Sequence, residues 1–352
     1  MSKTDLTARK ARWCAFYERA PEVPFLFQIN CDPGAPPRPL PNPGQSEARV
    51  NWAWAQYERW MARAEWLKDD FLPSLDVYTG TEIFAEAFGC PVHRPDDNMP
   101  FALPIIHRAE EVEALAVPAI EDTPLAGLFD IADELRRRAG PEALMKLVDI
   151  QSPMDIAALI WDKNEFYIAM IETPEAVRQL AEKVHTLLTR FMDRWFARYG
   201  KDFIAHFPYY YMPQGLTLSE DEVGAVNGDM FDAFFAPELA RLSERYGGLG
   251  MHCCANARHQ WSRFARIPGL RVLNICQPAE IVREAYAYFA PTVAQTHGNV
   301  WDGPAWDWPA QFPSGARVIV EIGAATPKEA IELAARLEEK HNICPLRSCG
   351  HT

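Results

Sequence analysis

Hydrophobic and polar residues along this chain repeat with helical and strand periods in turn, most regularly over about its last 200 residues. The clearest helix is predicted over residues 173–200, where Val177 and Leu180 begin a long apolar stripe. Thr173 fits its N-terminal cap and Gly200 fits its exit. The pattern therefore predicts a strong amphipathic helix at the centre of the chain.

The remaining pattern predicts alternating helices and strands. Further helices are predicted over residues 4–20, 51–68, 230–247 and 326–340. Strands are predicted over residues 21–30, 143–151, 206–212, 249–255, 271–277, 292–299 and 317–325. This alternation is typical of a parallel sheet covered by helices.

A closed (β/α)8 TIM barrel with extra N-terminal helices fits the length best, and a doubly wound open sheet is the alternative. No G-x-G-x-x-G follows a predicted strand, which disfavours the dinucleotide-binding form of that alternative. Because no linker divides the chain, we predict a single α/β domain over residues 1–352. Residues 1–70 would supply its N-terminal helical extension and first strand.

Composition narrows the possible partners. The chain has 352 residues and a net charge of -13, which argues against nucleic-acid binding. Its first residues, MSKTDLTARKARWCAFYERA, lack the apolar core of a signal peptide, and no apolar stretch is long enough to span a membrane. These features predict a cytoplasmic protein, whose eight cysteines would serve as free thiols or metal ligands.

One pair of residues suggests metal chemistry. His252 and Cys254 lie two positions apart on a predicted strand, so their side chains point the same way, whereas Cys253 should face the packing side. By itself this spacing favours two core residues over a metal site. Its place at a strand end, with Cys344 and Cys349 available near the C-terminus, favours a catalytic zinc site. His351 lies in the same tail and stays open as a ligand.

Other polar residues lie near predicted strand ends, where the active site of a barrel is built. Each of them, taken singly, is more readily a hydrogen-bonded structural residue than a substrate contact. His297 and Glu321 are also candidates for a partner of a zinc ligand or for a further ligand. The predicted substrate-binding residues are Gln28, Asn30, Asp149, Gln151, Tyr210, Gln277, His297 and Asn299.

Several segments resemble the uroporphyrinogen decarboxylase superfamily, in which H-x-C-G-N precedes a helix and a further strand. The resembling segments are GLGMHCCANARHQWSRFARIPGLRVLNICQP, GTEIFAEAFGCPV, QSPMDIAALIWDKNEFYIAMIETPEAVRQLAEKV, MFDAFFAPELARLSERYG and IGAATPKEAIELAARL. The resemblance covers most of residues 70 to 352 and implies a TIM barrel. Ala255 departs from the family's usual glycine after the H-x-C cysteine.

The superfamily contains decarboxylases and cobalamin-dependent methyltransferases. The decarboxylases hold their acidic substrate with an arginine-rich N-terminal segment, but the matching FLFQINCDPGAPPRPLP has only Arg38. The methyltransferase branch carries zinc on H-x-C plus a cysteine near the C-terminus. In this chain the resemblance assigns those positions to His252, Cys254 and Cys349, with Cys344 or Glu321 as alternatives for the third.

The resemblance thus implies a zinc-dependent methyltransferase that resembles the methylcobalamin:thiol, coenzyme M-type branch. Its methyl donor would be a methylcorrinoid, either free or on a separate corrinoid protein, because no D-x-H-x-x-G signature occurs here. Its acceptor would be a small thiol or tetrahydrofolate. Two alternatives remain: a decarboxylase or lyase of a small carboxylic acid on the same fold, and a non-catalytic corrinoid-binding protein.

Overall fold

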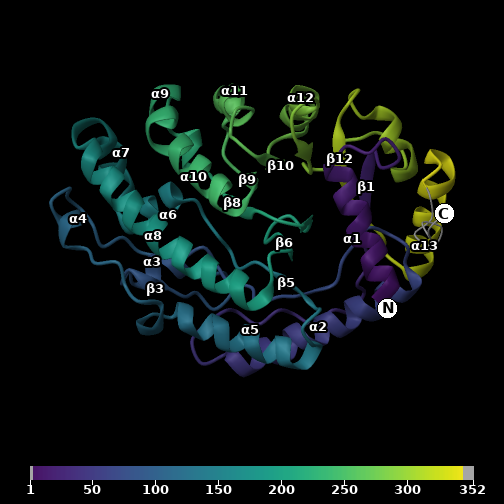
Figure 1. Ribbon diagram of the computed structural model, residues 1–352, viewed down its shortest axis with the longest axis horizontal. Coiled ribbons are helices and arrows are strands. Elements are labelled where there is room, and N and C mark those ends of the chain that lie inside the picture. The colour runs from purple at the N-terminus through teal and green to yellow at the C-terminus, as the bar shows by residue number, and fades with distance from the viewer. Residues whose placement is uncertain (1–2, 344–352) are drawn as a thin grey trace.

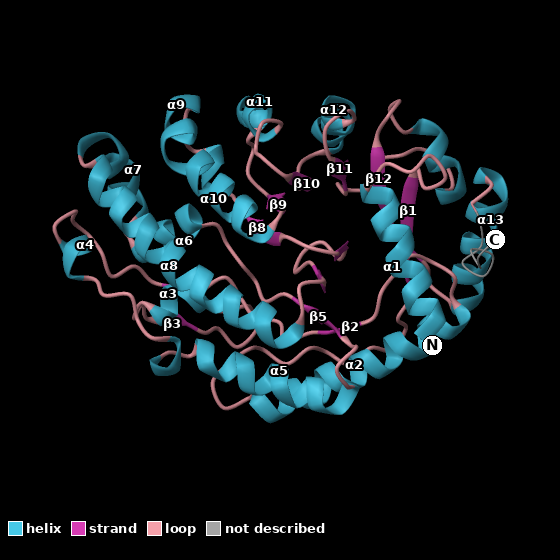
Figure 2. Cartoon of the chain, viewed as in Figure 1, coloured by secondary structure: helices cyan, strands magenta, loops and turns pink. Residues whose placement is uncertain are grey.

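The computed structural model describes residues 3–343 and shows a barrel of parallel strands surrounded by helices (Figures 1 and 2). The barrel is built from a six-stranded parallel sheet, β1-β12-β11-β10-β9-β8, and from the parallel pair β2-β5 of a second sheet, which β6 (Phe203–Ile204) continues in parallel and β7 (Tyr211–Met212) in antiparallel. The wall strands are β1 (Phe25–Asn30), β2 (Ser74–Leu75), β5 (Leu144–Lys146), β8 (Leu216–Ser219), β9 (Leu249–Cys253), β10 (Leu270–Ile275), β11 (Ala294–Gln295) and β12 (Arg317–Gly323). The predicted TIM-barrel architecture is confirmed.

Helices lie outside the strands on all sides of the ring (Figure 2). The longer ones are α1 (Lys3–Tyr17), α2 (Ser46–Trp66), α5 (Leu125–Ala139), α6 (Pro153–Ile160), α7 (Lys163–Glu172), α8 (Pro174–Tyr199), α10 (Ala236–Tyr246), α12 (Ala279–Phe289) and α13 (Pro327–His341). Short helices are α3 (Ile83–Ala87), α4 (Glu111–Ala114), α9 (Gly228–Met230) and α11 (Trp261–Phe264). Within the described residues, no helix is long and apolar enough to cross a membrane.

The predicted central helix is α8, which begins after Thr173 and ends before Gly200. Gly200 has a φ of 99°, a left-handed conformation that favours glycine at a helix exit. The two sheets meet beyond β5, where Gln151 forms a parallel bridge with Ser219. We call the end of the barrel formed by the carboxyl ends of these strands the mouth.

One seam of the barrel is not closed by strand pairing: in residues 3–343 no ladder joins β1 to β2. Carboxylates take the place of the missing strand. The N–H groups of Phe27 and Ile29 donate to Asp70 and Asp69, each at 2.9 Å, and Arg63 donates to the carbonyl of Ile29 at 2.5 Å. These bonds satisfy the free edge of β1, because an unpaired buried backbone group would be destabilising.

The strand predicted over residues 206–212 is wrong. The structure has instead two short strands, β6 (Phe203–Ile204) and β7 (Tyr211–Met212), joined as a hairpin. β6 pairs in parallel with β5, and β8 follows the hairpin and pairs with β9. Pro208 lacks the N–H that a central strand needs, so the aromatic run around it forms a loop. A second hairpin, β3 (Val92–His93) and β4 (Phe101–Ala102), lies outside the barrel wall.

The core has a large part, which includes the barrel interior and most of the outer helices, and a smaller part between β1, β12 and α13. Leu26 of β1 belongs to the main core, whereas its neighbours Phe25 and Phe27 pack with Leu333 and Leu337 of α13. Successive residues of β1 therefore face the barrel interior and the outer helix in turn. By this alternation Gln28 faces inward, which places its amide close to the mouth.

Candidate metal centre

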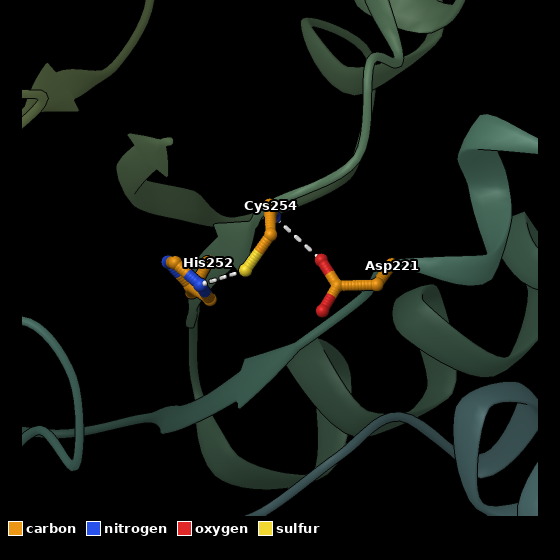
Figure 3. A group of neighbouring side chains, drawn as sticks. All are labelled: Asp221, His252 and Cys254. Atoms are coloured by element: carbon orange, nitrogen blue, oxygen red, sulfur yellow. Dashed lines mark hydrogen bonds between the residues drawn. The ribbon is translucent and has the colours of Figure 1, made fainter. Parts of the chain in front are cut away.

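Three potential metal ligands meet at the mouth, at the ends of two neighbouring strands (Figure 3). Asp221 follows β8, His252 lies near the end of β9, and Cys254 comes directly after β9. Their ligand atoms all lie within 4.8 Å of one another. His252 Nε2 is 2.9 Å from Cys254 Sγ, and the Cys254 N–H donates to Asp221 Oδ1 at 2.5 Å. The group thus offers one nitrogen, one sulfur and one oxygen.

Asn274 of β10 orients the imidazole of His252. The Asn274 side-chain nitrogen donates to the carbonyl of Thr296, so its Oδ1 is the atom that faces His252 Nδ1, 2.5 Å away. An amide oxygen only accepts, and therefore Nδ1 carries the proton. The lone pair of Nε2 is then directed at Cys254 and Asp221, which is the tautomer that a metal-binding histidine needs.

The electrostatics of the group favour a cation. Partial burial of the sulfur, followed by the negative charge of Asp221, raises the pKa of Cys254 to about 12. A cysteine in this setting stays protonated at neutral pH unless a positive charge compensates Asp221. A divalent metal ion would supply that charge, and a nitrogen, sulfur and oxygen donor set fits zinc.

Behind the group, two buried carboxyl groups support the loop that carries Asp221. Asp155 accepts hydrogen bonds from the N–H groups of Asp221 at 2.7 Å and Glu222 at 3.0 Å. Burial, followed by repulsion from Asp155, raises the pKa of Glu220 well above its usual range. Glu220 is fully buried, so we expect it to be neutral at physiological pH. These contacts fix the position from which Asp221 reaches the site.

The other cysteines lie at different places. Cys253 is buried on the opposite side of β9, with its thiol 3.7 Å from the carbonyl of Ala255. Cys276 is exposed at the end of β10, and its N–H donates to the carbonyl of Cys253 at 3.0 Å. Cys344, Cys349 and His351 lie outside the described residues. Glu321 is on β12 and is not part of the three-residue group.

The expected substrate-binding residues are spread around the mouth. Gln28 and Asn30 line a small cavity together with Glu321. Gln277 donates to the carbonyl of Cys254 at 2.6 Å, and Asn299 donates to the carbonyl of Glu321. These residues are therefore placed where a substrate could reach them.

Asp149 and Gln151 lie on the segment after β5. Asp149 pairs with Nε2 of His206 at 3.2 Å, a partner that the sequence did not suggest. Gln151 forms the bridge to Ser219 that joins the two sheets. His206 thus orients Asp149 at the mouth, whereas the backbone of Gln151 is part of the barrel wall.

His297 and Tyr210 face away from the mouth space. His297 Nδ1 accepts from the N–H of Ile275 at 2.9 Å, and Nε2 lies 2.9 Å from Gln295 Oε1. Both ring nitrogens are occupied, and burial lowers the pKa of His297 to about 3. Tyr210 is buried, with its hydroxyl packed beside Gly250. We therefore leave both residues out of the substrate site proposed below.

The structure adds a buried polar network at the mouth. Lys146 Nζ donates to Asp76 at 3.0 Å and to the hydroxyl of Tyr209 at 2.8 Å, and that hydroxyl lies 3.1 Å from Asp76. Burial lowers the pKa of Lys146 although Asp76 opposes this shift. There was little indication of this network in the sequence, because Asp76 and Lys146 each appear as a single charged residue within an apolar segment.

Comparison with known proteins agrees with this fold. The family model for uroporphyrinogen decarboxylase matches residues 77–300, which is more than half of the chain. The chain therefore belongs to the uroporphyrinogen decarboxylase family. No curated protein sequence matches it significantly.

Solved structures extend the likeness over most of the chain. A methyltransferase from Methanosarcina mazei is similar with a TM-score of 0.58 at 13% identity, covering 88% of each chain. The homocysteine methyltransferase MmuM from Escherichia coli, in its apo form, has a TM-score of 0.24 at 15% identity, covering 67% of this chain and 95% of that one. The first of these likenesses supports the barrel fold.

Proposed function

We propose that this protein is a zinc-dependent methyltransferase that moves a methyl group from a methylcorrinoid to a small thiol or to tetrahydrofolate. The observation that carries the proposal is the group of Asp221, His252 and Cys254 at the barrel mouth. A catalytic zinc site has three protein ligands of these types and one open position. In this proposal Asp221 is the third zinc ligand. The sequence suggested Cys349, Cys344 and Glu321 for that position.

The chain's own residues would bind and orient the reactants. Zinc, when bound, would lower the pKa of a coordinating thiol and so produce a nucleophile at neutral pH. Asn274 holds the His252 tautomer, and Gln277 holds the backbone of Cys254. Phe207 packs edge to face on His252 with ring centroids 4.9 Å apart and covers one side of the site with an apolar ring. Gln28, Asn30, Asp149, Gln277 and Asn299 would contact the substrate.

With a thiol as the acceptor, its sulfur would form a bond to the methyl carbon while the cobalt–carbon bond of the donor breaks. The electron pair of that bond would stay on the corrinoid, and the proton of the thiol would be released. Positioning of the two reactants supplies much of the rate in such a transfer. The corrinoid would arrive free or on a separate protein.

Decarboxylation of a substrate with many carboxylates fits this mouth less well. Arg38 is exposed, and its guanidinium lies over the ring of Tyr78 at 4.7 Å. It is the only arginine in residues 25–41. Lys146 is already paired with Asp76. These cations do not form the cluster that several carboxylates would need.

An activity assay tests the proposal. Zinc-loaded protein prepared anaerobically should demethylate methylcobalamin in the presence of at least one member of a panel of small thiols and tetrahydrofolate, with the corresponding change in cobalamin absorbance. Chelator-treated protein is the control and should be inactive until zinc is restored. If zinc-loaded protein fails to demethylate methylcobalamin with every acceptor in the panel, the proposed function is wrong.

Asn274→Ala should lower zinc affinity by about 10–100-fold, because it removes the acceptor that fixes the His252 tautomer. Asn274→Asp keeps an acceptor oxygen and should retain most of the affinity. The measurement is a competition titration against a chromophoric zinc chelator. Asn299→Ala, at the mouth but outside the metal group, is the matched control. Equal affinities in wild type and Asn274→Ala would contradict the orienting role of Asn274.

A further inference from the structure

A cavity of about 140 Å³ lies beside the unpaired seam between β1 and β2. Gln28 and Glu321, which are paired in register on β1 and β12, form one side of it. Trp60 and Arg63 of α2 reach it from the side where β2 would otherwise continue the wall. The cavity therefore exists because this edge of β1 is satisfied by side chains in place of a strand.

The negative end of the cavity is Glu321. Within the described part of the chain, no cation or hydrogen-bond donor is paired with its carboxylate. The amide nitrogen of Gln28, the neighbour of Glu321 on β1, donates to the carbonyl of Tyr209 at 2.6 Å and not to the Glu321 carboxylate. Glu321 thus presents an uncompensated carboxylate to the cavity.

The positive end of the cavity is Arg63, which is only 7% exposed. Asp69 is its carboxylate partner at 2.7 Å, but Arg9 binds the same carboxylate at 2.8 Å. Two guanidinium groups therefore share one negative charge. The Nε of Arg63 is buried and has no hydrogen-bond partner among residues 3–343. This end of the cavity carries an excess of positive charge and an unused donor.

Aromatic rings wall the space between these two ends. Trp60 packs edge to face on Phe71, with ring centroids 5.4 Å apart, and on Tyr209, with ring centroids 5.7 Å apart. The guanidinium of Arg63 lies 4.3 Å from the centroid of the Phe71 ring. Aromatic faces beside a carboxylate are a setting that binds ammonium groups, methylated ones included.

We propose that this cavity binds a small zwitterion, a molecule of the amino-acid or betaine type. Its carboxylate would meet Arg63, and its ammonium would meet Glu321 and the ring of Trp60. A ligand with one charge alone would leave the opposite end of the cavity uncompensated. The proposal depends neither on zinc nor on methyl transfer, so its failure and that of the proposed function are distinguishable.

Calorimetric titration of the full-length protein tests this site with four probes: glycine, glycine betaine, tetramethylammonium and acetate. We expect at least one of the two zwitterions to bind more tightly than both single-charge probes. Glu321→Gln should weaken that binding by about tenfold, because it removes the carboxylate that lines the cavity and would meet the ammonium group. Glu332→Gln is the matched control, since Glu332 is likewise an exposed carboxylate but lies on α13 and does not line the cavity.

Trp60→Leu keeps the charges and removes the aromatic wall, so it should also weaken the zwitterion. Three results would overturn the proposal. They are binding of neither zwitterion, binding of tetramethylammonium or acetate as tightly as the better zwitterion, and unchanged affinity in Glu321→Gln.

Discussion

Cys254→Ser is expected to lower zinc affinity by more than about 100-fold, which exceeds the effect of losing a residue that only supports a ligand. Serine leaves a hydroxyl that stays protonated at neutral pH, whereas cysteine binds zinc as a thiolate. His252→Ala should have a similar effect, because it removes the nitrogen 2.9 Å from Cys254 Sγ. Zinc content after anaerobic purification and metal competition titration measure both losses.

The neighbouring cysteine provides the control. Cys253→Ser makes the same chemical change one position away, on the buried side of β9, and should leave the zinc content unchanged. Loss of zinc in Cys253→Ser, or full zinc content in Cys254→Ser, would contradict this assignment. The third ligand is decided by the same measurement, since Asp221→Ala should lose zinc and Cys349→Ser should keep it.

Asp69→Ala is expected to destabilise the folded protein by about 3–5 kcal/mol, the cost of removing one partner from a buried charge network. Asp69 is 2% exposed and binds both Arg9 and Arg63, so its loss leaves two buried guanidinium groups without their carboxylate. It also leaves the N–H of Ile29 on the open edge of β1 without its acceptor. Denaturant unfolding followed by circular dichroism measures the change.

Asp302→Ala is the matched control, because the Asp302 side chain is 85% exposed in its contact with Arg283. A surface pair of this kind contributes about 1 kcal/mol or less. If Asp69→Ala were destabilised no more than Asp302→Ala, the buried network would not be what closes the seam. The same variant should also perturb the zwitterion cavity, since Arg63 lines it.

The loop between β6 and β7 connects the metal group and the cavity. Phe207 packs on His252, and Tyr209, two residues later, lines the cavity and bonds Lys146. A ligand in the cavity would therefore contact the same loop that covers one side of the metal group. This arrangement places both candidate sites at one barrel mouth.

Local patterns in the sequence were sufficient for much of the barrel. The apolar stripe of residues 173–200 and the alternation around His252 and Cys254 depend on neighbours a few positions away, so they can be read from the chain. Wall strands of two to four residues, such as β2 and β8, contain too few positions to show a period. The loop around Pro208 was mistaken for a strand because it is rich in aromatic residues, although Phe207 is exposed and Tyr210 is buried without being in a strand.

The sequence by itself determined the fold class, the family and two of the three metal-ligand candidates, because each depends on local periodicity or on a short motif. Only the tertiary structure placed Asp221 beside His252 and Cys254, and Asn274 behind the imidazole. These residues are 22 or more positions from at least one of their partners, and no local pattern records which strands become neighbours in the barrel. The positions of the charged residues at the seam between β1 and β2 likewise depend on strand order and packing.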